Sequence, residues 1–101
     1  MKILIVTDAW HPQVNGVVTT LSNVKKELIN AGHQVDIVEP SLFKSIPLVG
    51  YSEIKIAIET NQLKKYVLNE NYDCIHISTE GPLGLRARIL CRKHKIQFTT
   101  A

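Results

Sequence analysis

The sequence predicts an α/β fold, built as a doubly wound parallel sheet of about five strands with helices on both faces. Three observations predict it. Strand-like and helix-like segments alternate along all 101 residues. Residues 2–7 form an almost unbroken Ile/Leu/Val run, which is typical of a strand buried on both faces of a parallel sheet. From Val17 to Ala31 the apolar positions are spaced four, three, four and three residues apart, as on one face of a helix.

The later segments continue this alternation. We expect further strands at residues 35–38, 54–58, 74–77 and 96–100, and helices at residues 63–70 and 82–94. Gly32 stands where a helix C-cap belongs, and Pro82 suits the first turn of a helix, where its missing N–H costs nothing. Residues 54–58 alternate apolar with other residues, which indicates a strand near a sheet edge. Residues 40–53 have no clean period, so we expect a long loop there.

Composition and charge exclude several classes of protein. Hydrophobic residues make up 45% of the chain and charged residues 21%, so the sequence can build an apolar core and is not intrinsically disordered. No window approaches the ~18 consecutive apolar residues of a membrane-spanning helix, and the first apolar run is too short for a signal peptide. We therefore expect one cytoplasmic domain, with association at a membrane surface left open.

Basic residues gather on the predicted helices. The largest group lies between Arg86 and Lys95, mostly off the apolar stripe of its helix. A solvated helix face is the default interpretation, and a docking surface for anionic lipid or another domain is the alternative. The net charge of +3 is mild for a nucleic-acid-binding protein, and aromatic residues do not interleave with the basic ones, so we expect no nucleic-acid partner.

The cysteines and histidines do not predict a metal site. Cys74 and Cys91 lie in apolar runs without a Cys-x-x-Cys pattern, which favours reduced thiols in the core over a disulfide or a zinc site. No pair of histidines has metal-ligand spacing; the four are His11, His33, His76 and His94. We expect no metal and no cofactor, and we interpret His76 as an interior residue with a satisfied hydrogen bond.

The predicted winding places a ligand site at one sheet edge. In the doubly wound order 3-2-1-4-5, the first and fourth strands are neighbours, and ligands bind at the carboxyl ends of the strands where the winding reverses. The loops after residues 7 and 77 should therefore face each other. The residues delivered to this edge are Asp8, His11, Asn15, Gly16, Glu39, Ser78, Thr79, Glu80 and Gly81.

Gly16 and Val17 are candidate phosphate donors. They open the first predicted helix, whose N-terminal N–H groups and dipole attract anions, and a glycine lets a phosphate approach the backbone. The alternative is that Asn15-Gly16 is only a turn. The loop holds a single glycine after residue 7, so it is neither a dinucleotide fingerprint nor a P-loop. Glu39 could bind a ribose, or it could be a solvated strand end beside Pro40.

The segment of Thr79, Glu80 and Gly81 precedes the third predicted helix. Glu80 or Thr79 could accept a hydrogen bond from a substrate hydroxyl, with Gly81 allowing a close approach. The alternative for Glu80 is ordinary helix capping. His11 is the histidine expected at the same sheet edge, on the acceptor side, although no carboxylate is placed to orient it as a general base.

Two segments resemble a known enzyme family. Residues 1–18, MKILIVTDAWHPQVNGVV, resemble the amino-terminal segment of retaining family-four glycosyltransferases, which have two Rossmann-like domains. Residues 73–84, DCIHISTEGPLG, are similar to the fourth-strand motif of the same family. Many relatives have Gly-Gly where this chain has Asn15-Gly16. Together the two motifs fall on the loops that the winding places face to face.

The resemblance implies transfer of a sugar from a nucleotide-sugar donor to a hydroxyl of a glycan or lipid acceptor, with the anomeric configuration retained. It assigns Asn15, Gly16 and Val17 to the donor diphosphate. It places Thr79, Glu80 and Gly81 towards the acceptor, and residues 41–51 where acceptor specificity varies. Family members bind most of the nucleotide in a second, carboxy-terminal domain, so residues 1–101 are expected to be an amino-terminal piece that is inactive alone.

A freestanding α/β module that binds a nucleotide or phosphate, without transferase activity, is the alternative. A receiver domain needs clustered acids after the first strand and an aspartate after the third, whereas Asp8 stands alone after the first strand and Glu59 is the nearest acid after the third. A flavodoxin needs a short, hydroxyl-rich phosphate loop, which residues 8–12 match poorly. A parent chain that continues into a second domain would distinguish the transferase from such a module.

Overall fold

The computed structural model describes residues 1–11, 16–43, 45–48, 51–57, 62–69, 71–79 and 81–100. In chain order its elements are β1 (Lys2–Val6), α1 (Gly16–Asn30), β2 (Gln34–Val38), the short 3-10 helix η1 (Pro40–Leu42), β3 (Ser45–Leu48), β4 (Tyr51–Ala57), α2 (Leu63–Asn69), β5 (Cys74–Ile77), α3 (Pro82–Lys93) and β6 (Thr99–Thr100).

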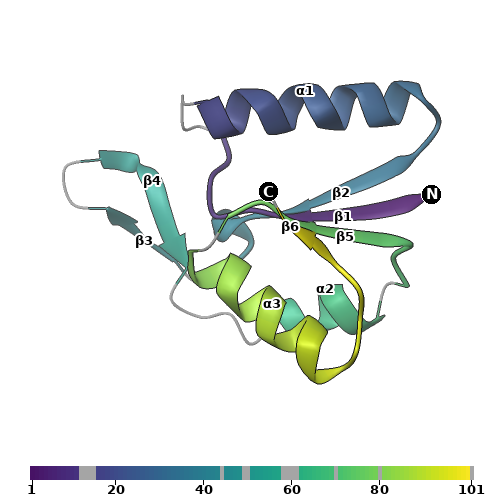
Figure 1. Ribbon diagram of the computed structural model, residues 1–101. Coiled ribbons are helices and arrows are strands. Elements are labelled where there is room, and N and C mark those ends of the chain that lie inside the picture. The colour runs from purple at the N-terminus through teal and green to yellow at the C-terminus, as the bar shows by residue number, and fades with distance from the viewer. Residues whose placement is uncertain are drawn as a thin grey trace.

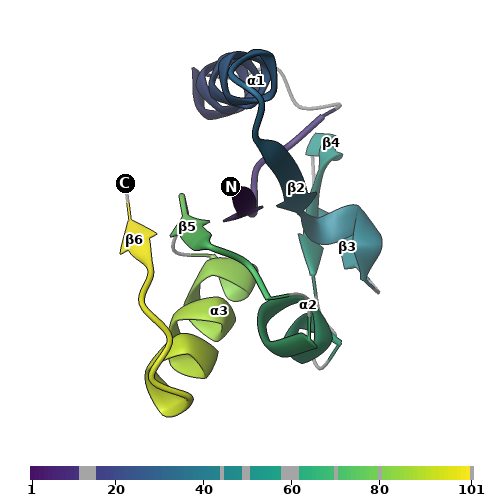
Figure 2. The same ribbon diagram turned by 90° about the vertical axis from the view of Figure 1, so that its right-hand side faces the viewer.

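The main sheet is parallel and has four strands in the order β2-β1-β5-β6. Helix α1 covers one face, and α2 and α3 lie on the other (Figures 1 and 2). The first strand pairs with β5 in register from Ile3 with Cys74 to Val6 with Ile77. The predicted α/β class, the parallel sheet and the neighbouring first and fourth predicted strands are confirmed.

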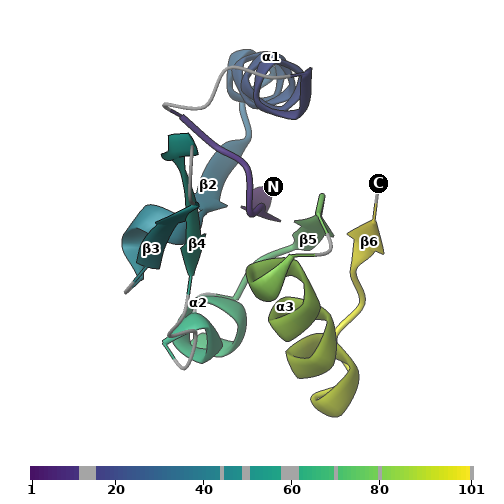
Figure 3. The same ribbon diagram turned by 90° about the vertical axis from the view of Figure 1, so that its left-hand side faces the viewer.

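One predicted strand does not join this sheet. Residues 54–57 of the strand expected at residues 54–58 belong to β4, which pairs antiparallel with β3 in a separate two-stranded sheet, and residue 58 lies outside the described residues. Figure 1 shows this hairpin to the left of the main sheet, beyond the end of β2, and Figure 3, seen from that side, shows it in front of β2. The main sheet therefore has four strands rather than five, and the order 3-2-1-4-5 was wrong in its first member. The alternating pattern is more typical of an antiparallel strand than of a buried parallel one, which explains the difference.

The loop expected at residues 40–53 also contains regular structure. Its first residues form η1 and its middle forms β3. Pro47 lies within β3, opposite Lys55, and the pairing shifts register just after it. Proline cannot donate a hydrogen bond to a ladder, so it is tolerated in a short edge strand such as this one.

The core lies on both faces of the sheet. Leu4 and Val6 of β1 pack on the side of α2 and α3, whereas Ile3 and Ile5 pack under α1. This alternation leaves four consecutive residues of β1 buried, as the sequence predicts for a strand covered on both faces. The other fully buried large residues include Leu63 of α2 and Leu83 of α3.

The helix ends follow the sequence signals closely. Gly32 follows α1 with a φ of +93°, a conformation that favours glycine after a helix. Pro82 is the first residue of α3, as predicted. Helix α3 ends at Lys93, with His94 as its C-cap.

The start of α3 is held by a residue from another strand. Its N-cap position is Gly81, which has no side chain to cap the helix. The Asp8 carboxylate, just after β1, does so instead: Oδ1 accepts a hydrogen bond from the Leu83 amide at 2.9 Å, and Oδ2 accepts one from the Gly84 amide at 3.2 Å. Asp8 thus ties the end of β1 to the helix that follows β5.

Two glycines allow the start of α3 to lie close to Asp8 and Thr79. A Cβ on Gly81 would lie 2.5 Å from Cγ of Asp8, and a Cβ on Gly84 would lie 1.8 Å from the Thr79 carbonyl oxygen. Real Cβ atoms do not make such contacts, so both positions require glycine if α3 is to start where it does. Gly16, in contrast, has open space around the position of a Cβ.

We predict that Asp8→Ala lowers the free energy of unfolding by about 2 kcal/mol, because two helix amides lose a charged acceptor. Asp8→Asn should lower the free energy of unfolding by less, since the amide oxygen of the asparagine still accepts one hydrogen bond. Urea denaturation measures both. Glu27→Gln, which removes an exposed acid from α1, is the control and should change stability by less than about 0.5 kcal/mol. Equal losses in Asp8→Ala and the control would contradict this role of Asp8.

We predict that Gly84→Ala destabilises the fold by about 3 kcal/mol or more, because the added methyl group meets the backbone of Thr79. Gly16→Ala is the matched control: it adds the same group to another helix, in open space, and should change stability by less than about 0.5 kcal/mol. Thermal unfolding of the two variants compares them directly. Equal melting temperatures would show that α3 can shift away from β5 at little cost.

Candidate functional site

The loops after β1 and β5 meet at one edge of the sheet, as the winding predicted. The Thr79 hydroxyl donates a hydrogen bond to Oδ2 of Asp8 at 2.6 Å and accepts one from the Asp8 amide at 2.8 Å. The Ser78 amide donates to the Val6 carbonyl at 3.0 Å, which continues the pairing of the two strands to the edge. This contact fixes the relative position of the two loops.

Thr79 has a limited hydrogen-bonding capacity left. A hydroxyl can donate one bond and accept two. Its one donor faces Asp8 and one acceptor position is taken by the Asp8 amide. Thr79 can therefore accept one more hydrogen bond, from a ligand hydroxyl for example, but it cannot donate one while it is bound to Asp8.

The remaining candidate residues fall into two groups. Gly81 lies against Asp8, on the side of Thr79. His11 lies on the side of α1: its Nε2 is 3.0 Å from the Ser22 hydroxyl, and its ring packs edge-on against Trp10. The structure therefore brings Thr79 and Gly81 together, and it places His11 with α1. Asn15 and Glu80 lie outside the described residues.

Gly16 and Val17 form the first turn of α1. Gly16 is exposed and Val17 is 43% exposed. The first amides of a 15-residue α-helix have no partner within the helix, and the dipole adds positive potential there. Apart from the chain neighbours of Gly16 and the backbone of its own helix, no heavy atom of the described residues lies within 4 Å of the Cβ position at Gly16, which leaves room for a ligand there.

Asp8 is the residue whose role the sequence reasoning missed. The sequence places Asp8 at the correct edge, but the part it plays depends on α3, which is 75 residues away in the chain. One signal was available. The segment Gly81-Pro82 opens a helix without a capping Ser, Thr, Asp or Asn, which implies that another part of the chain caps it.

Glu39 serves as a local cap rather than as a solvated strand end. Its side chain is 9% exposed, and Oε2 accepts a hydrogen bond from the Ser41 amide at 3.0 Å. Its other carboxylate oxygen, Oε1, accepts a hydrogen bond from the Ser41 hydroxyl. Since Glu39 is the N-cap of η1, its carboxylate is occupied by the chain itself and gives no support to a ribose site.

The histidines and cysteines have structural surroundings. His76 is half-buried in β5, its Nδ1 lies 2.7 Å from the Thr99 hydroxyl, and burial lowers its pKa, so the ring is neutral at pH 7. Cys91 is buried, and burial raises the pKa of its thiol, while Cys74 is half-buried; both are free, as expected. Among the residues that the structure describes, no group of His, Cys, Asp and Glu could hold a metal ion.

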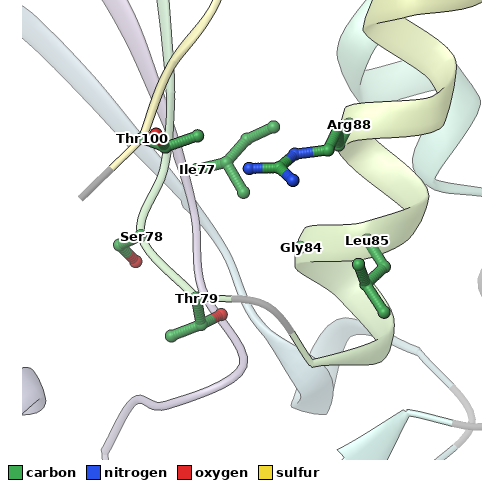
Figure 4. Close-up of a pocket in the computed structure, with 7 residues that line it drawn as sticks. All are labelled: Ile77, Ser78, Thr79, Gly84, Leu85, Arg88 and Thr100. Carbon is green, nitrogen blue, oxygen red and sulfur yellow. The ribbon is translucent and has the colours of Figure 1, made fainter.

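Two hollows adjoin this edge. A groove of about 570 Å³ runs between α1 and the sheet; its wall is mainly apolar and reaches from Gly16 and Ser78 to Leu28 and Cys74. A second pocket of about 20 Å³, large enough for one water molecule, lies between β5, β6 and α3. In Figure 4 the Arg88 side chain extends from α3 towards Ile77 and Thr100 in this pocket.

Comparison with known proteins identifies relatives. A protein-family model described as glycosyltransferase family 4 matches residues 14–100. An alpha-monoglucosyldiacylglycerol synthase from Streptococcus pneumoniae (strain ATCC BAA-255 / R6) is 28% identical over 110 residues, which cover 95% of this chain and 25% of the relative. A protein of the same name from Acholeplasma laidlawii is 24% identical over 111 residues, which cover 95% of this chain and 28% of the relative.

This chain spans about a quarter of the length of these curated relatives. No solved structure matches it. Within the part of the chain that the structure describes, no helix is long and apolar enough to cross a membrane.

The matched segment contains both sides of the edge described above. It includes the first turn of α1, with Gly16, and the loop after β5, with Thr79 and Gly81. The family match also covers most of the chain, which favours the transferase over the freestanding module as the interpretation of this fold. The chain therefore belongs to glycosyltransferase family 4.

Proposed function

We propose that this chain forms the amino-terminal, acceptor-side portion of a glycosyltransferase that moves a sugar from a nucleotide-sugar donor to a hydroxyl acceptor, with retention at the anomeric carbon. The observation that carries the proposal is the family match over residues 14–100, which includes the start of α1 and the loop after β5. The nucleotide-sugar is a substrate, and the proposal includes no cofactor and no metal.

The donor diphosphate would lie at the first turn of α1, beside Asn15, Gly16 and Val17. Three features support this assignment. Backbone N–H groups point outward at the N-terminus of this 15-residue helix, the dipole favours an anion there, and the space around the Cβ position of Gly16 is open. Since these amides sit at the same sheet edge as Thr79, donor and acceptor would be near each other.

The acceptor would approach from the loop after β5, with Glu80 and His11 as further candidates. The Thr79 hydroxyl is held by Asp8 with one acceptor position left, so it could orient a hydroxyl that donates to it. Gly81 presents backbone without a side chain next to this hydroxyl. Asp8 would act as a positioning residue, because it holds Thr79 and the start of α3 in place.

We propose that the acceptor is a lipid rather than a soluble glycan. Both relatives are named for the synthesis of a monoglucosyldiacylglycerol, which is a glycolipid. The groove between α1 and the sheet opens at the same edge and has a mainly apolar wall, which suits hydrocarbon. A cytoplasmic enzyme with a lipid acceptor would work at a membrane surface, in peripheral contact with anionic lipid.

Substrate binding would be divided between two domains, as in other members of the family. Most contacts to the nucleotide would come from a second, carboxy-terminal Rossmann-like domain, and residues 1–101 would have no useful transferase activity by themselves. The comparison with the relatives is consistent with a second domain, because this chain matches only about a quarter of the length of each relative.

We predict that Gly16→Leu in the full-length protein lowers kcat/KM for the nucleotide-sugar by about tenfold or more, which corresponds to about 1.4 kcal/mol of lost binding to the transition state. The leucine would cover the amides at the start of α1 while leaving the fold intact, since the space there is open. Initial rates against donor concentration, with several nucleotide-sugars, measure the effect.

Asn23→Leu provides the control, because it places the same side chain at an exposed position further along α1. The donor kinetics of Asn23→Leu should match those of the unmodified enzyme. Both variants should have the same melting temperature as the unmodified enzyme. Donor kinetics that are unchanged in Gly16→Leu would remove Gly16 from the donor site.

A further inference from the structure

The Asp8 carboxylate and the Thr79 hydroxyl form a hydrogen-bonded pair with a fixed direction. The Asp8 amide donates to Oγ1 of Thr79 at 2.8 Å, and the Thr79 hydroxyl donates to Oδ2 of Asp8 at 2.6 Å. The hydroxyl is the donor in the second bond, because a carboxylate only accepts. A distance of 2.6 Å is typical of a short, charge-assisted O–H···O⁻ bond. The proton of Thr79 therefore already points at a base.

Thr79 also lies beside a space that fits a hydroxyl group. It lines the pocket of about 20 Å³ between β5, β6 and α3, which has room for one water molecule (Figure 4). A hydroxyl group is no larger than a water molecule, so the hydroxyl of a ligand fits there. The Arg88 side chain extends into the same pocket, and a nearby cation makes it easier for a hydroxyl to lose its proton.

We propose that Thr79 and Asp8 form a proton relay for the acceptor hydroxyl. The acceptor O–H would donate to Oγ1 of Thr79, whose own proton points to Oδ2 of Asp8. This inference rests on the proposed function, in which the hydroxyl of a lipid attacks a nucleotide-sugar. Thr79 would be the catalytic residue, because it touches the acceptor, and Asp8 would act through Thr79.

The relay moves two protons while one bond forms and another breaks. The acceptor oxygen bonds to the anomeric carbon, and the bond from that carbon to the diphosphate oxygen breaks, with its electron pair leaving on the diphosphate. The acceptor proton moves to Oγ1 of Thr79, and the proton of Thr79 moves to Oδ2 of Asp8. Thr79 ends unchanged, and Asp8 ends neutral until it releases its proton to water.

A carboxylate is a weak base, but it is strong enough for this step. The acceptor oxygen becomes strongly acidic as its bond to the anomeric carbon forms, so the proton is lost readily at that stage. The leaving diphosphate is the other group that could take the proton. That route does not need the Thr79 hydroxyl, so removal of this hydroxyl distinguishes the two.

Single-turnover kinetics of the full-length protein test the relay. Transfer to dioleoylglycerol in detergent micelles is measured first with UDP-, GDP- and ADP-glucose, and the fastest donor is kept. Thr79→Val removes the hydroxyl at constant shape, and Asp8→Asn keeps an accepting oxygen that cannot take up the proton. Each should lower the rate of transfer about 100-fold without changing the donor concentration for half-maximal rate, since general base catalysis contributes roughly 10²–10⁴.

The solvent isotope effect separates a relay from a purely structural role. Because two protons move together, the unmodified enzyme should be slower in D₂O, and its rate should fall along a curve as the deuterium fraction rises. Thr79→Ser keeps the hydroxyl, so it should keep this curve and a rate within about fivefold of the unmodified enzyme. A straight line in the unmodified enzyme would overturn the relay, whether or not the variants fold.

Thr19→Val and Glu27→Gln are the matched controls. They make the same chemical changes at exposed positions of α1 and should lower the rate less than about threefold. Thermal unfolding shows which variants keep the fold. Sugar transfer that continues in Thr79→Val at the same rate, with the same isotope effect, would assign the proton to the diphosphate and overturn the relay alone. Absence of transfer to the lipid with every donor would overturn the proposed function, and the relay with it.

Discussion

The Asp8 carboxylate connects the loop after β1 to the loop after β5 and to the start of α3, and the rest of the site depends on that connection. It follows β1, yet its oxygens accept hydrogen bonds from the amides of Leu83 and Gly84, at the start of a helix whose N-cap residue, Gly81, has no side chain. A helix start without a capping group leaves unpaired donors, and a carboxylate is the best partner for them because it also meets the positive end of the dipole. The same carboxylate holds the Thr79 hydroxyl. One side chain therefore sets the position of a helix and of the loop before it.

This constraint explains why glycine is needed on one side of the crevice and merely allowed on the other. Gly81 and Gly84 have no room for a Cβ, because the carboxylate of Asp8 and the backbone of Thr79 lie too near. Gly16 has ample room. The first two glycines therefore serve the fold, and the openness at Gly16 leaves the start of α1 accessible to an anion. In the proposed enzyme, a rigid acceptor side would thus face an accessible donor side.

Local signals predicted the elements better than they predicted the pairing. The buried strand β1, the end of α1 at Gly32 and the start of α3 at Pro82 were all predicted correctly, because each depends on near neighbours in the chain. The strand expected at residues 54–58 was found in β4, but its partner is β3 and not the main sheet. Its alternating pattern fits an antiparallel hairpin, whereas the alternation of strands and helices along the chain favoured a place in the main sheet. The role of Asp8 could not be read locally, since it joins residues 75 positions apart.

Amide hydrogen exchange at the start of α3 tests the central claim most directly. In the unmodified protein, the amides of Leu83 and Gly84 should exchange slowly, because Asp8 accepts their hydrogen bonds. In Asp8→Ala, we expect both to exchange about tenfold faster or more, whereas the amides of β1 and β2 keep their relative protection. If Leu83 and Gly84 exchange at the same rate in both proteins, Asp8 does not hold α3, and this explanation of the crevice is wrong.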